Sequence, residues 1–67
     1  MIHVTVNGAA HRFDAPLDVR AILEKLDMAG KKVAVERNGE IVPKGLHART
    51  QVQDGDRLEI VVAVGGG

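Results

Sequence analysis

The chain of 67 residues is long enough for one small domain, and its nine basic residues balance nine acidic ones. Because of this balance, and with Phe13 as the only Phe, Tyr or Trp, we expect no nucleic-acid partner. Without cysteine the chain has no disulfide and no thiol nucleophile. It contains no long apolar stretch and no signal segment, so we expect it to be cytoplasmic and to have no membrane span.

The first elements are predicted to form a β-hairpin. Apolar and polar residues alternate over residues 2–6, and Asn7-Gly8 follows, a pair that favours the positive φ angles of a two-residue turn. A second strand is expected over residues 9–14. With such a turn, the pattern places Val4 opposite His11 and Ile2 opposite Phe13.

A helix is predicted over residues 18–28. Its apolar residues form one stripe at helical spacing: Val19, Ile22, Leu23 and Leu26. Asp18 is the expected N-cap, because its carboxylate can accept hydrogen bonds from the first free N–H groups. Gly30 is the expected left-handed residue at the C-terminal cap, because glycine adopts positive φ without a steric penalty.

Two further strands are predicted over residues 32–37 and 40–42, joined by a second Asn-Gly turn. Pro43 ends this hairpin, and the connection that follows is expected to bury Leu46. The sequence Asp-Gly-Asp at residues 54–56 is typical of a turn, in which carboxylates accept backbone hydrogen bonds and the glycine takes a positive φ.

The apolar run over residues 58–64 predicts the last strand, with alternate side chains on opposite faces of the sheet. Only one helix is available, so the face without the helix meets either solvent or a partner. Val61 and Ala63 are apolar residues of that face and are therefore candidates for partner contact. Scattered exposed apolar residues are common, which is the alternative interpretation.

The order strand, strand, helix, strand, strand, strand makes the helix a crossover within one mixed sheet. The predicted fold class is therefore α+β, a mixed sheet of four to five strands with one helix packed across one face.

Side chains that could perform catalysis or hold a metal are not expected to come together. His3 and His11 fall on opposite faces of the first hairpin and His47 lies in a distant turn, so we expect no metal site. The chain contains no serine and no glycine-rich loop between a strand and a helix. We therefore expect no catalytic residue and no bound cofactor.

Three glycines, Gly65, Gly66 and Gly67, follow the last strand. Glycines bury no side chain and lose much entropy when they are ordered, so they do not stabilise a core. They can present the carboxylate of Gly67 on an arm that passes through channels too narrow for a Cβ. We expect a domain over residues 1–64 and a flexible tail over residues 65–67, with a frayed terminus as the alternative.

Three segments together resemble the ThiS family, the sulfur-carrier proteins of thiamine biosynthesis: residues 33–43 (VAVERNGEIVP), residues 52–60 (VQDGDRLEI) and the final glycines. The resemblance covers the whole chain in length and element order. Its specificity lies in the Asp-Gly-Asp corner, one short strand before the glycines. It implies a ubiquitin-like β-grasp fold. Many members end in two glycines, so whether Gly65 belongs to the strand or to the arm stays open.

The resemblance implies a protein co-substrate and not an enzyme. The last glycine, here Gly67, is expected to be adenylated with ATP by a ThiF-like adenylyltransferase and converted to a thiocarboxylate. Sulfur is expected to come from cysteine through a cysteine desulfurase, and the acceptor is expected to be a ThiG-like thiazole synthase. By the same resemblance Gly65 and Gly66 thread the partners' active sites, ATP is used by the activating partner, and the free carrier is a monomer.

Two alternatives stay open from the sequence. A carrier resembling the small subunit of molybdopterin synthase shares the fold and the tail but serves another pathway; the length and the VERNGEIV segment favour the thiamine carrier. A non-covalent ubiquitin-like binding module offers its sheet face or an edge strand to a partner, with the glycines only as a spacer.

Overall fold

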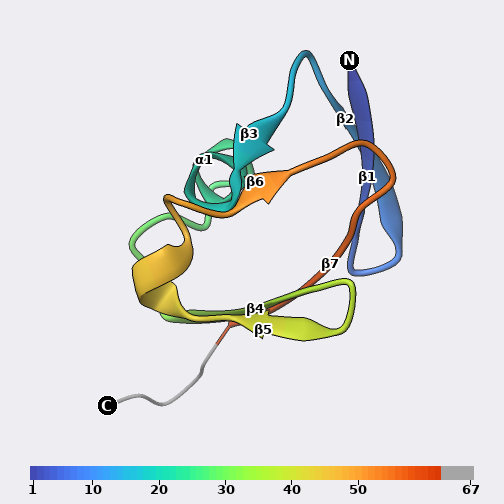
Figure 1. Cartoon of the computed structure of the whole chain (residues 1–67). Helices are drawn as coiled ribbons and strands as arrows, with labels where there is room; N and C mark the ends of the chain where they lie inside the picture. Colours follow the sequence, from blue (N-terminus) through green and yellow to red (C-terminus); the bar gives the residue numbers. More distant parts are fainter. Residues whose placement is uncertain (63–67) are drawn as a thin grey trace.

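The computed structural model describes residues 1–62 and arranges them as a sheet with a helix lying across one face (Figure 1). The elements, in chain order, are β1 (Ile2–Val6), β2 (Ala9–Phe13), β3 (Leu17–Asp18), α1 (Val19–Lys25), β4 (Val33–Arg37), β5 (Glu40–Val42), the 3₁₀ helix η1 (Lys44–Leu46), β6 (Gln51–Val52) and β7 (Arg57–Val62). No helix within these residues is long and apolar enough to cross a membrane.

The main sheet has five strands in the order β2-β1-β7-β4-β5. β1 and β7 run parallel at its centre, and the other neighbours are antiparallel. A parallel pair needs a long crossover connection, which here includes α1. The predicted α+β class, a mixed sheet with one helix across a face, is confirmed.

Both Asn-Gly pairs form the predicted tight turns. Asn7 and Gly8 have φ angles of 50° and 83°, and the corresponding angles at Asn38 and Gly39 are 52° and 87°. Positive φ at both central residues matches the right-handed twist of the flanking strands, which is why this pair favours hairpins. The predicted register of the first hairpin is confirmed: Val4 lies opposite His11, and Ile2 opposite Phe13.

A second, two-stranded sheet joins β3 to β6 and was not predicted. Leu17 pairs with Val52, and Asp18 pairs with Gln51. Each strand has only two residues, and alternation over two residues cannot be distinguished from an irregular loop. This pairing holds the start of α1 against the connection that leads to β7.

The helix is shorter than predicted and ends with a different residue in the left-handed region. Asp18 is the N-cap as expected, and its Oδ1 accepts a hydrogen bond of 2.8 Å from the Ala21 N–H. At the other end, the N–H of Met28 donates to the carbonyl of Leu23 and the N–H of Asp27 donates to the carbonyl of Glu24. Asp27 takes a φ of 61°.

These bonds form a Schellman motif in which Asp27, and not Gly30, is the left-handed residue. The prediction for Gly30 at this cap is therefore wrong. A short polar side chain tolerates positive φ, so the helix ends before the glycine is reached.

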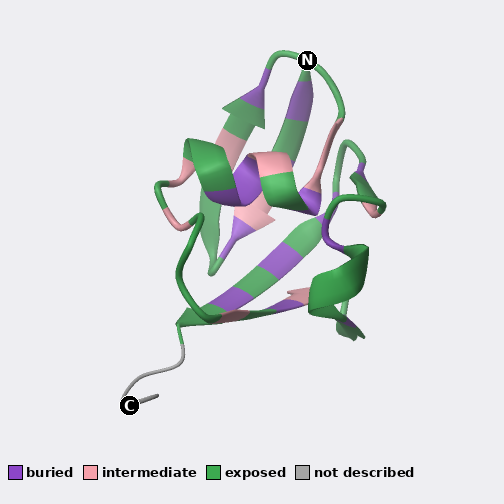
Figure 2. Ribbon diagram, turned by 90° about the vertical axis from the view of Figure 1, so that its left-hand side faces the viewer, coloured by how far each residue is buried: buried purple, intermediate pink, exposed green. Residues whose placement is uncertain are grey.

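Figure 2 shows that the buried residues gather between the helix and the sheet. The fully buried side chains come from both layers and from the β3–β6 pair: Ile22, Leu58, Val4, Val19, Val35 and Val52. Each large apolar side chain buried in this way contributes about 1.5–3 kcal/mol of transfer free energy. Leu58 of β7 is one of these residues, so packing against the interior helps to hold this strand.

The connection after β5 buries a histidine instead of the predicted leucine. Leu46 is 46% exposed, whereas His47 is 8% exposed. The Nε2 of His47 lies 3.1 Å from the carbonyl oxygen of Val42. Because a carbonyl only accepts, Nε2 carries the hydrogen, and this bond satisfies the buried ring. The expectation for Leu46 followed hydrophobicity alone, and it is wrong because the 3₁₀ turn directs the next residue inward.

Candidate functional site

β7 is the strand from which the chain continues toward the glycines, and neighbours hold it on both sides. On one side, Thr5 and Val6 of β1 pair with Arg57 and Leu58. On the other side, β4 runs along β7 as far as the pair of Val33 with Val62. The last described residue of the chain therefore belongs to a central strand, and its position is determined by the sheet.

The turn of the first hairpin extends the support of β7 beyond the end of β1. The side chain of Asn7 accepts a hydrogen bond of 2.7 Å from the Ile60 N–H and donates one of 2.9 Å to the Ile60 carbonyl. An amide side chain carries the same donor and acceptor as a peptide group. Asn7 therefore takes the place of one more residue of β1 in the parallel pair.

The turn of the second hairpin binds the other end of β7. The Oδ1 of Asn38 accepts a hydrogen bond of 2.9 Å from the Arg57 N–H, and its Nδ2 donates one of 3.0 Å to Asp56. The backbone N–H of Asn38 also donates to the Arg57 carbonyl. Each Asn-Gly turn thus uses its asparagine twice, once for the turn and once to hold β7.

Asp56 is a buried carboxylate at the entrance of β7 and is 8% exposed. One oxygen, Oδ2, accepts hydrogen bonds of 2.8 Å from the Gln53 N–H and from Arg37 Nε, and Oδ1 accepts from Asn38. Burial by itself raises the pKa of Asp56. The hydrogen bonds and the charge of Arg37 outweigh it, so the pKa of this carboxyl lies below its ordinary value of 3.8.

Asp54 begins the same corner and is bound to β1. Its Oδ1 accepts a hydrogen bond of 2.7 Å from the His3 N–H, which is the main cause that lowers the pKa of Asp54. Gly55 has a φ of 89°, and its N–H donates to the carbonyl of His3. The predicted turn at residues 54–56 is confirmed. It also bonds to β1 through His3 and to β4 through the contact of Asp56 with Arg37.

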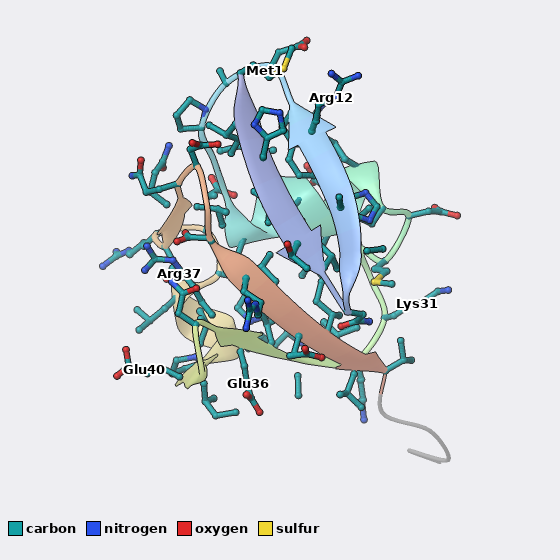
Figure 3. The ribbon with its side chains drawn as sticks, turned by 90° about the vertical axis from the view of Figure 1, so that its right-hand side faces the viewer. Met1, Arg12, Lys31, Glu36, Arg37 and Glu40 are labelled. Atoms are coloured by element: carbon teal, nitrogen blue, oxygen red, sulfur yellow. The ribbon has the colours of Figure 1, made fainter. Side chains whose placement is uncertain are left out.

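The face of the sheet without α1 carries exposed apolar side chains. Figure 3 looks onto this face, with the helix behind the sheet. Val61 and Ile41 are each 63% exposed, and Ala34 lies opposite Val61 in the β4–β7 pair. The structure therefore places Val61 in solvent, as expected, beside Ala34 of β4. Ile41 lies one strand further away, on β5, opposite Glu36. The other candidates for contact and modification, Ala63, Gly65, Gly66 and Gly67, lie outside the described residues.

The histidines are separated in the structure. The Nδ1 of His3 lies 3.4 Å from Oδ1 of Asp54, and the ring of His11 stacks on that of Phe13 with their centroids 6.3 Å apart. His47, directly after η1, is buried. Within residues 1–62, no three His, Cys, Asp or Glu side chains gather in a way that could hold a metal ion.

The second roles of Asn7 and Asn38 and the pairing of Arg37 with Asp56 are not predicted by the sequence. The sequence holds one signal of these second roles: both hairpin turns contain asparagine. Aspartate or glycine would also suit such turns. A side chain that carries both a donor and an acceptor is needed only when a strand lies beside the turn. The neighbour of each turn becomes known only when β7 is placed between β1 and β4.

A five-stranded mixed sheet with a central parallel pair and one helix across a face defines a ubiquitin-like β-grasp domain. A crystal structure of a thiamine biosynthesis protein, ThiS, from Geobacter metallireducens matches this arrangement with a TM-score of 0.84 and 36% sequence identity. The match covers 98% of this chain and 100% of that chain.

The sequence relatives agree with the structural match. The sequence model of the ThiS family matches residues 4–67. A thiazole synthase from Paramagnetospirillum magneticum is 50% identical over 64 residues, which are 96% of this chain and 20% of that protein. An uncharacterized protein, ycf40, from Porphyra purpurea is 33% identical, over 98% of this chain and 93% of that protein.

The chain therefore belongs to the ThiS family, a family of small sulfur-carrier proteins. It spans about one fifth of the length of the thiazole synthases that it matches.

Proposed function

We propose that this protein carries sulfur for the biosynthesis of the thiazole part of thiamine, as a thiocarboxylate on Gly67. A partner adenylyltransferase of the ThiF type activates the carboxylate with ATP, and a thiazole synthase of the ThiG type accepts the sulfur. The observation that carries this proposal is how firmly β7 is held near its end. Its pairing with β4 reaches Val62, and the Asn7 side chain bonds the backbone of Ile60. Membership of the ThiS family supports the same role.

The chemistry of such a carrier is a sequence of acyl transfers at Gly67. A carboxylate oxygen attacks the α-phosphorus of ATP, pyrophosphate leaves, and an acyl-adenylate forms. The terminal sulfur of a persulfide, formed by a cysteine desulfurase, then attacks the acyl carbon and AMP leaves. A thiol cleaves the resulting S–S bond, so that one sulfur stays on the carrier as a thiocarboxylate and the other becomes part of a disulfide.

The carrier's own residues supply the substrate and not the catalysis. Within residues 1–62, the polar clusters described above bind backbone groups and one another, which is a structural use. The adenylating partner must therefore provide the groups that bind ATP and stabilise its leaving group.

The relatives support thiazole synthase as the acceptor. Two proteins that are named thiazole synthase contain a segment similar to nearly all of this chain, at 50% and 36% identity. A segment similar to this chain within proteins of that name supports a thiazole synthase as its partner. The exposed residue Val61, with Ala63 beyond it in the sequence, is proposed to contact the partners that act on Gly67.

Intact-protein mass spectrometry tests the proposal after incubation with ATP, the adenylyltransferase, a cysteine desulfurase, cysteine and a thiol. We expect a mass gain equal to the replacement of one oxygen by sulfur. Oxidation of either of the two methionines adds nearly the same mass, so the sulfur must be identified chemically. Because the chain contains no cysteine, a thiol-alkylating reagent labels the thiocarboxylate alone, and a label that maps to Gly67 establishes the carrier.

Two variants are matched to this test. Deletion of Gly67 and addition of a polar residue after Gly67 each move the terminal carboxylate by about 3.5 Å along an extended chain. Both are expected to fold normally and to gain no sulfur. Normal modification of either variant contradicts the proposal. If a blocked terminus leaves function unchanged, the protein is a non-covalent binding module. If the sulfur is transferred to molybdopterin synthase instead of thiazole synthase, the protein serves the molybdopterin pathway.

A further inference from the structure

A basic cleft lies on the side of the molecule where α1, the start of β4 and η1 meet. Its volume is about 690 Å³, which is within the range of about 300–1,000 Å³ typical of small-molecule sites. Ala34 of its lining also belongs to the exposed face that carries Val61, and Val33 of its lining pairs with Val62, so the cleft borders the end of β7. The proposed carrier chemistry at Gly67 makes no use of it.

The charge of this cleft is concentrated although the whole chain is neutral. Nine basic residues balance nine acidic ones overall. The cleft is lined by four cations and one carboxylate, which give a formal charge of +3: Arg20, Lys31, Lys32, Lys44 and Glu24. A cluster of like charges in a recess raises the local concentration of an oppositely charged ligand.

The three lysines are available to a ligand. None of the ion pairs among residues 1–62 involves Lys31, Lys32 or Lys44, and all three side chains are exposed. Figure 3 shows Lys31 extending from the connection between α1 and β4 into solvent. The one carboxylate of the lining, Glu24, is 3.9 Å from Arg20 on the same helix, so its charge is partly compensated.

The walls of the cleft are apolar at their base and are held together by backbone hydrogen bonds. Leu23 is buried, and Met28 and Val33 are half-buried beside it. The N–H of Arg20 donates to the carbonyl of His47 at 3.1 Å, which joins α1 to the segment after η1. The cleft is thus formed before any ligand binds, as is usual for small-molecule sites.

We propose that this cleft binds a small organic phosphate, with the phosphate among Lys31, Lys32 and Lys44 and the apolar part of the molecule against Leu23 and Met28. Lysine suits phosphate as a mobile point charge with three donors. An apolar base beneath cations favours an anion with an organic body over an inorganic one, because the body removes apolar surface from water.

Titrations followed by ¹H–¹⁵N NMR of the full chain at low ionic strength test this site. The probes are phenyl phosphate, which combines a ring with a phosphate, and inorganic phosphate. We expect saturable shifts of the amides over residues 31–33 and 44–48. The expected Kd for phenyl phosphate is below about 1 mM and about fivefold lower than that for inorganic phosphate.

Variants separate this site from general electrostatic attraction. Lys32→Gln and Lys44→Gln are each expected to raise the Kd about fivefold, and Ala48→Asp, at an exposed position of the lining, is expected to abolish binding. Lys25→Gln is the matched control, because it removes the same charge from an exposed position of α1 outside the lining. It is expected to change the Kd less than twofold.

Three results overturn the proposal. They are shifts that do not saturate, equal affinity for the two phosphates, and a Lys25→Gln variant that binds as weakly as Lys32→Gln. A fourth comparison uses a hexapeptide of glutamate. If this peptide binds in the cleft and phenyl phosphate does not, the site takes an acidic protein segment and the proposal is wrong.

Discussion

Replacement of Asp56 by asparagine tests whether one buried carboxylate holds the second hairpin turn to the entrance of β7. The carboxylate oxygens accept hydrogen bonds from Gln53, Arg37 and Asn38. The variant keeps the shape of the side chain. It removes the negative charge, and its NH₂ group must face at least one of these donors.

The expected effect is large for a domain of this size. A hydrogen bond to a charged group contributes about 1.5–3 kcal/mol, and a buried donor left without an acceptor costs about 1–3 kcal/mol. For Asp56→Asn we expect the free energy of unfolding at pH 7 to fall by about 2–4 kcal/mol. At about 0.05–0.15 kcal/mol per residue, a chain of this length has a total stability of roughly 3–10 kcal/mol.

The pH dependence gives a second, independent signature. The pKa of Asp56 is lowered in the folded state from its ordinary value of 3.8. Its stabilisation is therefore fully present above the unfolded pKa and is lost as the pH falls through the folded pKa. Urea denaturation from pH 7 to pH 2 is the assay. The difference between the wild-type protein and Asp56→Asn is expected to be constant above about pH 5 and to shrink below pH 4.

Asp54→Asn is the matched control, because it removes the same charge two residues earlier. The Asp54 side chain is 66% exposed, against 10% for Asp56, so a much smaller loss of stability is expected. The reasoning is refuted if the two variants lose equal stability at pH 7. It is also refuted if the deficit of Asp56→Asn is the same at pH 2.5 as at pH 7.

Two further variants test the supports of β7 and α1. Asn7→Gly keeps the positive φ of the turn but removes both side-chain hydrogen bonds to Ile60, so a loss of about 1–3 kcal/mol is expected. Hydrogen exchange of the Ile60 amide should quicken more than that of the Val35 amide in β4, and equal quickening would show general destabilisation only. Asp18→Ala removes the N-cap bond to Ala21, and urea denaturation is expected to show a loss of about 1 kcal/mol. An unchanged midpoint would show that the β3–β6 pairing alone holds the helix start.

Local patterns in the sequence were sufficient for the elements that depend on neighbouring residues. Alternation and the Asn-Gly pairs predict both hairpins, and the register of β1 with β2 follows from a two-residue turn. The stripe of Val19, Ile22 and Leu23, with Asp18 before it, predicts the helix and its first residue. The glycines and the Asp-Gly-Asp corner indicated the family, which the comparisons confirm.

The sequence failed where a residue's role depends on a distant strand or on a competing local geometry. Asp27 replaces Gly30 at the C-terminal cap because the Schellman bonds of Met28 and Asp27 end the helix earlier, although Gly30 also has a positive φ, of 85°. His47 replaces Leu46 in the interior because the carbonyl of Val42 satisfies its ring. Neither bond can be read from hydrophobicity.

The sequence by itself determined the types of the longer elements, the tight turns and the family, because these follow from spacing and backbone preference within a few residues. Only the tertiary structure decided what surrounds β7. Asn7 and Ile60 are 53 positions apart, and Arg37 and Asp56 are 19 apart. Such contacts form only when the crossover brings β7 between β1 and β4. The tertiary packing also brings Lys31, Lys32 and Lys44 to the lining of one cleft, because packing, and not proximity along the chain, sets these positions.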